Sequence, residues 1–329
     1  MKMLHALLRA VLVLACAAGA GAASVRAPAG SGGRHGFYRS MAKRAPAGSR
    51  RVFGGASAEL SAFPPTCVLM DRYWATRCSG AVLTPHWVLT AAHCVTPQVA
   101  YIQYNTRRPS SHDSNTAAVM YMYRHPQFTV REEDEGRGLD VTALRNDVGM
   151  LRTNMPMQLS SRPAVQSPMD PVRSLHLYDL KYLTDSEVQV LGFGGTERSA
   201  LGEELFEVRL RAVPCERGSW EHCMCGVGQP AAAGGARGVC AGDSGGPVVF
   251  RGAQVGVTSM GPIECSAAAE PPESATSVFT SLYQYSDLVN ATMYDTEETL
   301  KMRRLSSAAG APRSLPAPLA AALLVRALR

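Results

Sequence analysis

Hydrophobic positions in the middle of the chain fall into short runs separated by turn-forming residues. Such runs, rich in Val, Leu and aromatic residues, are typical of β-strands. No apolar repeat of helical period appears before the C-terminal part of the chain. Many short strands with turns between them indicate an all-β sandwich or barrel. The predicted strands are 66–70, 80–84, 87–90, 119–123, 148–152, 188–192 and 205–213.

The first residues have the pattern of a secretory signal peptide. Lys2 and Arg9 supply positive charge, residues 10–18 are apolar, and Ala-Gly-Ala at 20–22 fits a cleavage site. The apolar run is too short to cross a membrane. We therefore predict that residues 1–23 are removed, that the protein is secreted to the extracellular space, and that its cysteines can form disulfides.

Positive charge is concentrated at the two ends of the chain. The formal net charge is +6, but residues 1–51 carry nine Lys/Arg and no Asp/Glu. Residues 52–294 carry 18 Lys/Arg and 24 Asp/Glu, so the middle of the chain is acidic. Because an acidic domain repels a phosphate backbone, we expect no nucleic-acid partner there. A hydrophobic content of 46% is sufficient for a globular core.

The hexapeptide Gly-Asp-Ser-Gly-Gly-Pro at 242–247 is the strongest chemical signal. Its glycines allow a tight turn and close approach of a substrate, which suits presentation of Ser244 as a nucleophile. The N–H groups of Gly242 and Ser244 would form an oxyanion hole for the charge that develops on an attacked carbonyl. Serine needs a nearby base, and His93 in Thr-Ala-Ala-His-Cys is the candidate. Asp147, in Asn-Asp-Val-Gly-Met-Leu, is the candidate to orient that histidine.

These motifs, in the order His, Asp, Ser, resemble the trypsin/chymotrypsin family of serine proteases over residues 52–294. The resemblance implies two six-stranded antiparallel β-barrels, an active site in the cleft between them, and a C-terminal helix at residues 281–293. It implies hydrolysis of peptide bonds by acyl transfer, without a cofactor or metal. The expected partners are protein or peptide substrates and protein protease inhibitors, and we expect a monomer.

A second aspartate repeats the local pattern seven residues earlier. Asp140 begins Asp-Val-Thr-Ala-Leu-Arg, whereas Asp147 begins Asp-Val-Gly-Met-Leu-Arg. Asp140 follows the charged residues 131–138, which we interpret as an exposed loop insertion bordering the cleft. Asp147 follows Asn146 and precedes an apolar run, as the family's aspartate does. We favour Asp147 as the residue that orients His93, with Asp140 as the alternative.

Residues 24–51 are interpreted as a basic pro-segment. They contain seven basic residues, no acidic residue and no apolar period. They end in Ser-Arg-Arg before Val-Phe-Gly-Gly, which resembles the new N-terminus of activated family members. We predict that an Arg-specific protease cuts after Arg51, with the dibasic pair at 43–44 as a weaker alternative.

The resemblance also implies how such a cut would act. The freed amine of Val52 would enter the core and pair with the carboxylate of Asp243. A buried carboxylate without a partner is costly, so this pairing would rearrange the neighbouring loop and form the oxyanion hole. Activation would therefore be an electrostatic switch.

The resemblance places an uncharged specificity pocket beside Ser244. Gly238 lies at its floor, where trypsin-like members have an acid, and Gly261 leaves the entrance open. Ser277 is larger than the glycine of open-pocket members. A buried Arg or Lys of a substrate would find no counter-charge, so we predict cleavage after apolar residues. The expected substrate-binding residues are Gly238, Val239, Ser259, Met260, Gly261 and Ser277.

Three further positions depart from the family pattern. Ser79 stands where a glycine is usual, after the first cysteine of the histidine loop. Phe193 and Met260 each stand where a tryptophan is usual. None of the three is a candidate catalytic residue.

Eight cysteines remain after Cys16 leaves with the signal peptide, an even number that predicts a disulfide framework. Cys223 competes with Cys225 as the partner of Cys215. Cys67 and Cys223 are left unassigned, either bridged to each other or as buried thiols. A metal site at Cys-Met-Cys 223–225 is a weaker interpretation. The pairs implied by the resemblance are Cys78–Cys94, Cys215–Cys225 and Cys240–Cys265.

Residues 295–329 are an extension beyond the family pattern. Residues 315–329 are apolar, which favours a lipid-anchor signal, but Arg326 and Arg329 interrupt them. We expect a disordered extension without membrane anchoring. Asn290, in Asn-Ala-Thr, is the predicted glycosylation site.

Two other classes of function compete with the protease. A non-catalytic binding or signalling homologue on the same fold would carry a blocked site, although no triad residue is missing here. A structural or adhesion module has only the terminal extension in its favour. Covalent labelling of Ser244 separates these hypotheses from a protease.

Overall fold

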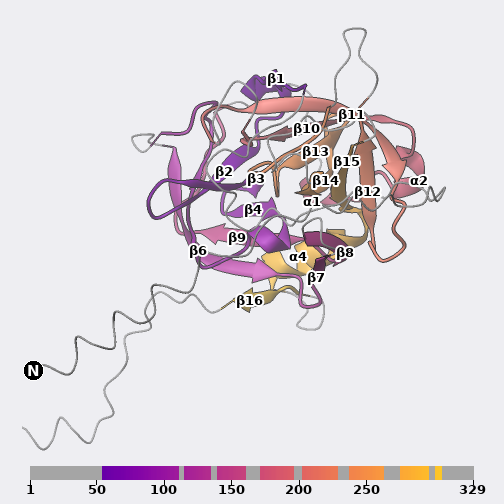
Figure 1. The fold of residues 1–329 in the computed structure, drawn as a ribbon. Coiled ribbons are helices and arrows are strands. Elements are labelled where there is room, and N and C mark those ends of the chain that lie inside the picture. Colours follow the sequence, from indigo (N-terminus) through magenta and orange to yellow (C-terminus); the bar gives the residue numbers. More distant parts are fainter. Residues whose placement is uncertain are drawn as a thin grey trace, which may run out of the picture. The chain divides into compact units, whose positions relative to one another are not determined.

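The computed structural model describes residues 54–110, 115–134, 139–160, 171–195, 202–228, 237–262, 275–295 and 301–305. The predicted signal peptide, the pro-segment with Arg51, and Val52 lie outside these residues, as does Cys265. Within them, the strands form two closed β-barrels and a separate hairpin (Figure 1). None of the helices in these ranges is long and apolar enough to cross a membrane.

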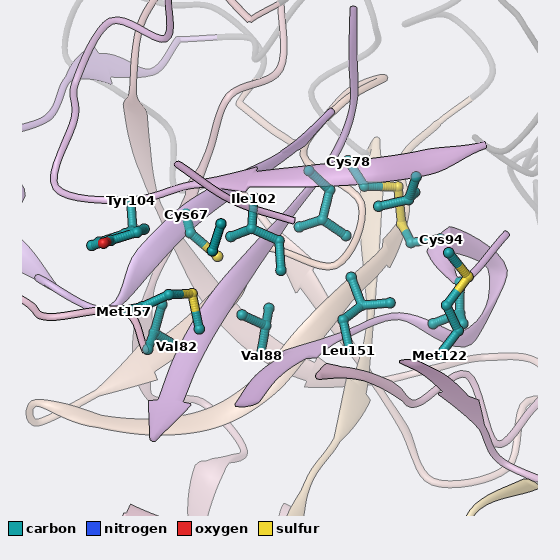
Figure 2. Packing of buried hydrophobic residues seen from close by; sticks show 14 of the residues in the cluster. Cys67, Cys78, Val82, Val88, Cys94, Ile102, Tyr104, Met122, Leu151 and Met157 are labelled. Carbon is teal, nitrogen blue, oxygen red and sulfur yellow. A yellow bond between two sulfur atoms is a disulfide. The ribbon is translucent and has the colours of Figure 1, made fainter. Parts of the chain in front are cut away.

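The first barrel closes as a ring of six antiparallel strands. Their order is β6-β5-β2-β3-β4-β9, and β6 also pairs with β9. All six strands place buried apolar side chains in one cluster, in which Leu69, Ile102 and Leu151 have no exposed surface. Figure 2 shows these interior side chains, with the Cys78–Cys94 disulfide at one end. The strands are β2 (Thr66–Asp71), β3 (Thr76–Thr84), β4 (Trp87–Thr90), β5 (Val99–Gln103), β6 (Thr116–Arg124) and β9 (Gly149–Thr153).

The second barrel is built in the same way from the C-terminal half. Its order is β11-β10-β13-β14-β15-β12, closed by pairing of β11 with β12. In β11, buried Val208, Leu210 and Ala212 alternate with Arg209 and Arg211, as expected for a strand with one face in a core. The strands are β10 (Glu187–Gly192), β11 (Phe206–Pro214), β12 (Cys223–Val227), β13 (Pro247–Phe250), β14 (Ala253–Met260) and β15 (Thr276–Ser281), with β1 (Ala56–Ser57) added beside β11.

The predicted all-β class and the two six-stranded barrels are therefore confirmed. The seven predicted strands are all present, and the predicted terminal helix is η3 (Tyr283–Tyr285) continued by α4 (Ser286–Tyr294). The barrels pack together through buried side chains such as Val68 and Met70 from the first and Phe193 from the second. The remaining short helices are η1 (Leu60–Ala62), η2 (Ala92–Cys94), α1 (Pro171–Ser174) and α2 (Leu180–Leu183).

The region interpreted as a loop insertion is a β-hairpin instead. Strands β7 (Thr129–Asp134) and β8 (Leu139–Arg145) pair antiparallel with each other. In the sequence they follow β6 and precede β9 of the first barrel. Val141 and Leu144 of β8 are buried together with Met260 and Val278 of the second barrel. These apolar contacts give the hairpin the buried face that a free loop lacks. The hairpin thus connects the two barrels.

The C-terminal extension is partly ordered, which corrects the prediction of disorder for 301–305. Strand β16 (Arg303–Leu305) pairs with the edge of β6. Just before it, Met302 is buried where the barrels meet, and its N–H donates to Thr292 Oγ1 at 2.8 Å. The strand forms because β6 offers an open edge while Met302 and Leu305 find apolar partners. Residues 306–329 lie outside the described chain.

Candidate active site

His93 is held on the short helix η2, directly after β4. The helix is buried, and only 9% of the surface of His93 is exposed. The neighbouring Cys94 is bonded to Cys78 on β3, which ties the helix to the barrel wall. The imidazole therefore has little freedom to move away from its partners.

Asp147 faces this histidine. It has no exposed surface and lies in the connection between β8 and β9. One carboxylate oxygen, Oδ1, accepts the His93 backbone N–H at 3.0 Å, and Oδ2 lies 2.8 Å from His93 Nδ1. Because an ionised carboxylate only accepts, Nδ1 carries a proton, and in the neutral form of the imidazole Nε2 presents a lone pair.

Asn146 forms a hydrogen-bonded turn directly before Asp147. Its backbone has φ +54°, a left-handed conformation that turns the chain just before Asp147. The Tyr285 hydroxyl donates to Asn146 Oδ1 at 2.9 Å, and Asn146 Nδ2 donates to the Gln127 carbonyl at 3.2 Å. These two bonds hold the turn that precedes Asp147.

Asp140 lies elsewhere and has a different partner. Its Oδ2 accepts from Arg217 Nη1 at 2.7 Å, and the same guanidinium nitrogen donates to the Val141 carbonyl. Arg217 belongs to the connection between β11 and β12 in the second barrel. The structure thus brings Asp147, and not Asp140, to His93.

The Ser244 turn packs against the segment that precedes His93. Gly245 has φ +77°, and a Cβ there would lie 2.0 Å from Thr90 Oγ1 and 3.0 Å from the Ala91 nitrogen. Only glycine allows this approach. Ser244 is 1% exposed. Its Oγ and His93 Nε2 are both buried without a hydrogen-bond partner in the described chain.

Asp243 is buried next to the candidate nucleophile. Its carboxylate accepts from Gly194 N and Cys240 N, each at 2.9 Å. Burial raises the pKa of this carboxyl to about 7, although the two backbone donors act in the opposite direction. No ion pair involving Asp243 occurs among the described residues.

Two glycines that the sequence prediction did not explain make room for this carboxylate. A Cβ on Gly194 would lie 2.5 Å from its carboxylate atoms, and one on Gly192 would lie 2.3 Å from Oδ1. The signal available in the sequence was the Gly-Phe-Gly triplet at 192–194. A Gly-x-Gly at the end of a strand indicates close approach of another group.

Of the six predicted pocket residues, Ser277 on β15 contacts Val239 and lies beside Gly238 in the segment before Ser244, while Ser259 and Met260 lie at the end of the neighbouring strand β14 and Gly261 follows it. Ser277 Oγ accepts from Val239 N at 3.0 Å, and a Cβ on Gly238 would lie 3.1 Å from that same oxygen. Ser259 Oγ lies 2.9 Å from Thr280 Oγ1. None of these six residues is charged, and Ser277 places a hydroxyl beside Gly238.

Two of the implied disulfides, Cys78–Cys94 and Cys215–Cys225, are present. Cys240 is also disulfide-bonded, while its expected partner Cys265 lies outside the described residues. Because the Cys225 sulfur is bonded to Cys215, a Cys-x-Cys metal site at 223–225 is excluded. The Cys78 and Cys94 sulfurs beside His93 are likewise used in a disulfide and cannot bind a metal as thiolates.

Cys67 and Cys223 are free thiols and do not bridge each other. Cys67 lies in the core of the first barrel, where Figure 2 shows its sulfur among aliphatic side chains. Cys223 lies under the β7–β8 hairpin. Burial raises the pKa of both thiols, so neither is present as a reactive thiolate at neutral pH.

Two antiparallel barrels with an Asp–His pair and a buried serine where they meet define the class of two-barrel serine proteases. The trypsin family model matches residues 52–289, and the chain belongs to this family. It is therefore a serine endopeptidase that acts on polypeptides.

Known relatives agree with this assignment. Pig glandular kallikrein is 28% identical over 76% of this chain and 98% of its own length. Mouse kallikrein-1 is 26% identical over 77% of this chain and 94% of its own length. Neuropsin, a serine protease expressed in mouse brain, has a similar fold, with a TM-score of 0.55 and 21% identity over 73% of this chain and 99% of the neuropsin chain.

Proposed function

We propose that the protein is a secreted endopeptidase, made as an inactive precursor, that cuts polypeptides after apolar residues. Ser244 Oγ attacks the substrate carbonyl while His93 Nε2 takes the serine proton. The same proton then passes to the leaving amine. Water next attacks the acyl-enzyme while His93 Nε2 takes a water proton, and this proton returns to Ser244 Oγ as the ester bond breaks and the acid is released. The observation that carries this proposal is the imidazole fixed at 2.8 Å by Asp147, with its Nε2 and Ser244 Oγ both buried and unpaired among the described residues.

The N–H groups of Gly242 and Ser244 serve as the oxyanion hole in this proposal. Within the turn, the N–H groups of Asp243, Gly245 and Gly246 are hydrogen-bonded to protein carbonyls. Those of Gly242 and Ser244 have no acceptor in the described part of the chain. Two such donors are available to a substrate oxygen, which supports their assignment.

Cleavage after Arg51 activates the precursor in this proposal. Support comes from Asp243, whose buried carboxylate has backbone N–H partners and no cationic partner in the described chain. A buried negative charge of this kind is strongly stabilised by a cation. The amine of Val52 would supply that charge once an Arg-specific protease has freed it.

Preference for apolar residues before the cut follows from the pocket. Gly238 carries no charge, and the Ser277 hydroxyl beside it already accepts a hydrogen bond from Val239. A substrate Lys or Arg would be desolvated there without a counter-ion. Leu, Met, Phe, Tyr and Val are the expected side chains, and Ser277 limits the depth available to them.

Secretion and glycosylation complete the proposal. Secretion rests on residues 1–23 and agrees with the disulfides, which persist in oxidising compartments. Asn290 is exposed on α4, as a glycan requires. Thr292 of the same sequon is buried and bonded to Leu288 and Met302, so a glycan would be added before the helix packs.

The test uses purified precursor before and after cleavage at Arg51. A fluorophosphonate probe should label the cut chain and not the uncut chain, and Ser244→Ala should abolish labelling. A peptide library should then show cleavage after apolar residues. The matched control is Ser281→Ala, which removes a buried hydroxyl of the second barrel that has no partner among the described residues.

Each outcome has a separate meaning. Absence of labelling after a verified cut would overturn the protease mechanism and favour a non-catalytic binding protein on this fold. Equal labelling of cut and uncut chains would overturn the zymogen proposal alone. Preference for Arg or Lys would overturn the pocket assignment alone.

A further inference from the structure

Ser79 carries a buried hydroxyl at a position where the family usually has glycine. It lies on β3, directly after Cys78, and has no exposed surface. The Ser79 Cβ has room because residue 246 is glycine. A Cβ added to Gly246 would lie only 3.2 Å from the Ser79 Cβ, which is closer than an ordinary van der Waals contact. A buried hydroxyl needs partners, and this one has both a donor and an acceptor.

The hydroxyl connects two segments of the second barrel. Ser79 Oγ donates to the Gly242 carbonyl at 2.8 Å and accepts the Phe193 N–H at 2.9 Å. The carbonyl belongs to the peptide unit between Gly242 and Asp243. The N–H of that same unit donates to the Cys240 carbonyl at 3.1 Å. This peptide plane is therefore held at both of its polar ends.

The backbone of Ser79 makes two more bonds to the candidate active site. Its N–H donates to the Ser244 carbonyl at 2.8 Å, and its carbonyl accepts from Thr90 Oγ1 at 2.9 Å. Thr90 precedes the helix that carries His93. One residue thus contacts the carbonyls on both sides of Asp243 as well as the segment leading to the candidate base.

We propose that Ser79 is a positioning residue that fixes the oxyanion-hole loop, an inference that rests on the proposed function of Gly242 and Ser244. Gly242 has φ +94° and no side chain to restrain it. The Ser79 hydroxyl supplies that restraint by locking the peptide plane after Gly242. The Gly242 N–H belongs to the preceding peptide unit, so fixing the plane after Gly242 restrains rotation about this glycine and limits how far its N–H can turn away from the oxygen that becomes negative in the transition state.

A positioning role predicts a particular kinetic result. The oxyanion forms in the transition state and not in the bound substrate, so misplacing its donor lowers kcat and leaves KM nearly unchanged. Ser79→Ala should lower kcat by about 10- to 100-fold. This loss in kcat should not exceed the loss caused by deleting an oxyanion-hole donor itself, because Ser79 acts only through the Gly242 loop. Binding of a peptide aldehyde, which forms a tetrahedral adduct with Ser244, should weaken in parallel.

The experiment compares cut, active-site-titrated wild type, Ser79→Ala, Ser79→Gly and Ser281→Ala. Both Ser79 variants lack the hydroxyl, so Ser79→Gly carries the test if the alanine variant does not fold. We expect reduced kcat and weaker aldehyde binding for both, with Ser281→Ala unchanged. Unchanged kcat in a folded variant, or a rise in KM alone, would overturn the inference. If wild type itself is not labelled by the fluorophosphonate, the proposed function has failed instead.

Discussion

Asp140 and Asp147 have similar local sequences and similar burial, but their surroundings give them different chemistry. Asp140 is 2% exposed and Asp147 is fully buried. Asp140 pairs with Arg217, a permanently charged group from the second barrel, at 2.7 Å. Asp147 pairs with the imidazole of His93, from the first barrel, at 2.8 Å.

The difference lies in what the partner can do. A guanidinium stays protonated, so the Asp140 pair neutralises charge and fastens the hairpin to the second barrel. An imidazole can gain and lose a proton near neutral pH, so the Asp147 pair can take part in proton transfer. The chemistry open to a buried aspartate therefore depends on the side chain with which it pairs, and the local sequence motif around the aspartate does not determine it.

The largest effect is expected when each aspartate is replaced by asparagine, which tests whether Asp147 and not Asp140 acts in catalysis. Asp147→Asn should lower kcat by about 10⁴-fold, because the amide favours the wrong tautomer of His93. Asp140→Asn, the matched control, should change kcat by less than about 10-fold per titrated active site, because this residue does not touch His93. Steady-state kinetics of the two cut variants provide the measurement. Similar losses in both would contradict the assignment.

Local pattern was sufficient to predict the strands, and the family resemblance implied the two barrels, but neither predicted the contacts between the barrels. The seven predicted strands all exist, since apolar runs and turns are encoded locally. The hairpin was missed because β7 is rich in charge and because the buried face of β8 packs against residues far along the chain. Asp140 and Arg217 are 77 residues apart, so no local motif pairs them.

The candidate site shows the same division. Sequence motifs identified His93, Asp147 and Ser244 as the candidate catalytic residues. The structure brings His93 and Asp147 into contact. Ser79 was visible as a departure from the family pattern, but its partners Phe193 and Gly242 lie 114 and 163 residues away. A role that depends on such contacts follows from the fold.

Asp243 is a third buried aspartate, and among the described residues its carboxylate pairs with neither a guanidinium nor an imidazole. Its pKa in the folded chain, about 7, is above the unfolded value of about 3.9. Folding therefore favours the protonated form. The stability this group provides is complete below about pH 4 and is lost as the pH rises through about 7. The loss is at most about 4 kcal/mol, from about 1.4 kcal/mol for each pKa unit.

Cleavage should remove this pH dependence, because the freed amine would stabilise the carboxylate. Urea unfolding of Ser244→Ala protein, which cannot digest itself, measures the effect at pH 5 and pH 8 before and after the cut at Arg51. We expect the uncut chain to lose stability at the higher pH and the cut chain to retain it. Parallel changes in both forms would argue against pairing of Val52 with Asp243.

The smallest expected effect concerns the partner of Asp140. Arg217→Met keeps an unbranched apolar stem but leaves the buried carboxylate without its guanidinium, and it removes the cation–π contact with Trp220 at 5.2 Å. Breaking a buried pair is costly, but 17% of the Arg217 side chain is exposed, so we expect a loss of about 2–3 kcal/mol in unfolding free energy. Arg217→Met combined with Asp140→Asn should recover much of this loss, because the second change removes the unpaired charge. Equal stability of the single and double variants would mean that the hairpin is held by Val141, Leu144 and their apolar neighbours and not by the ion pair.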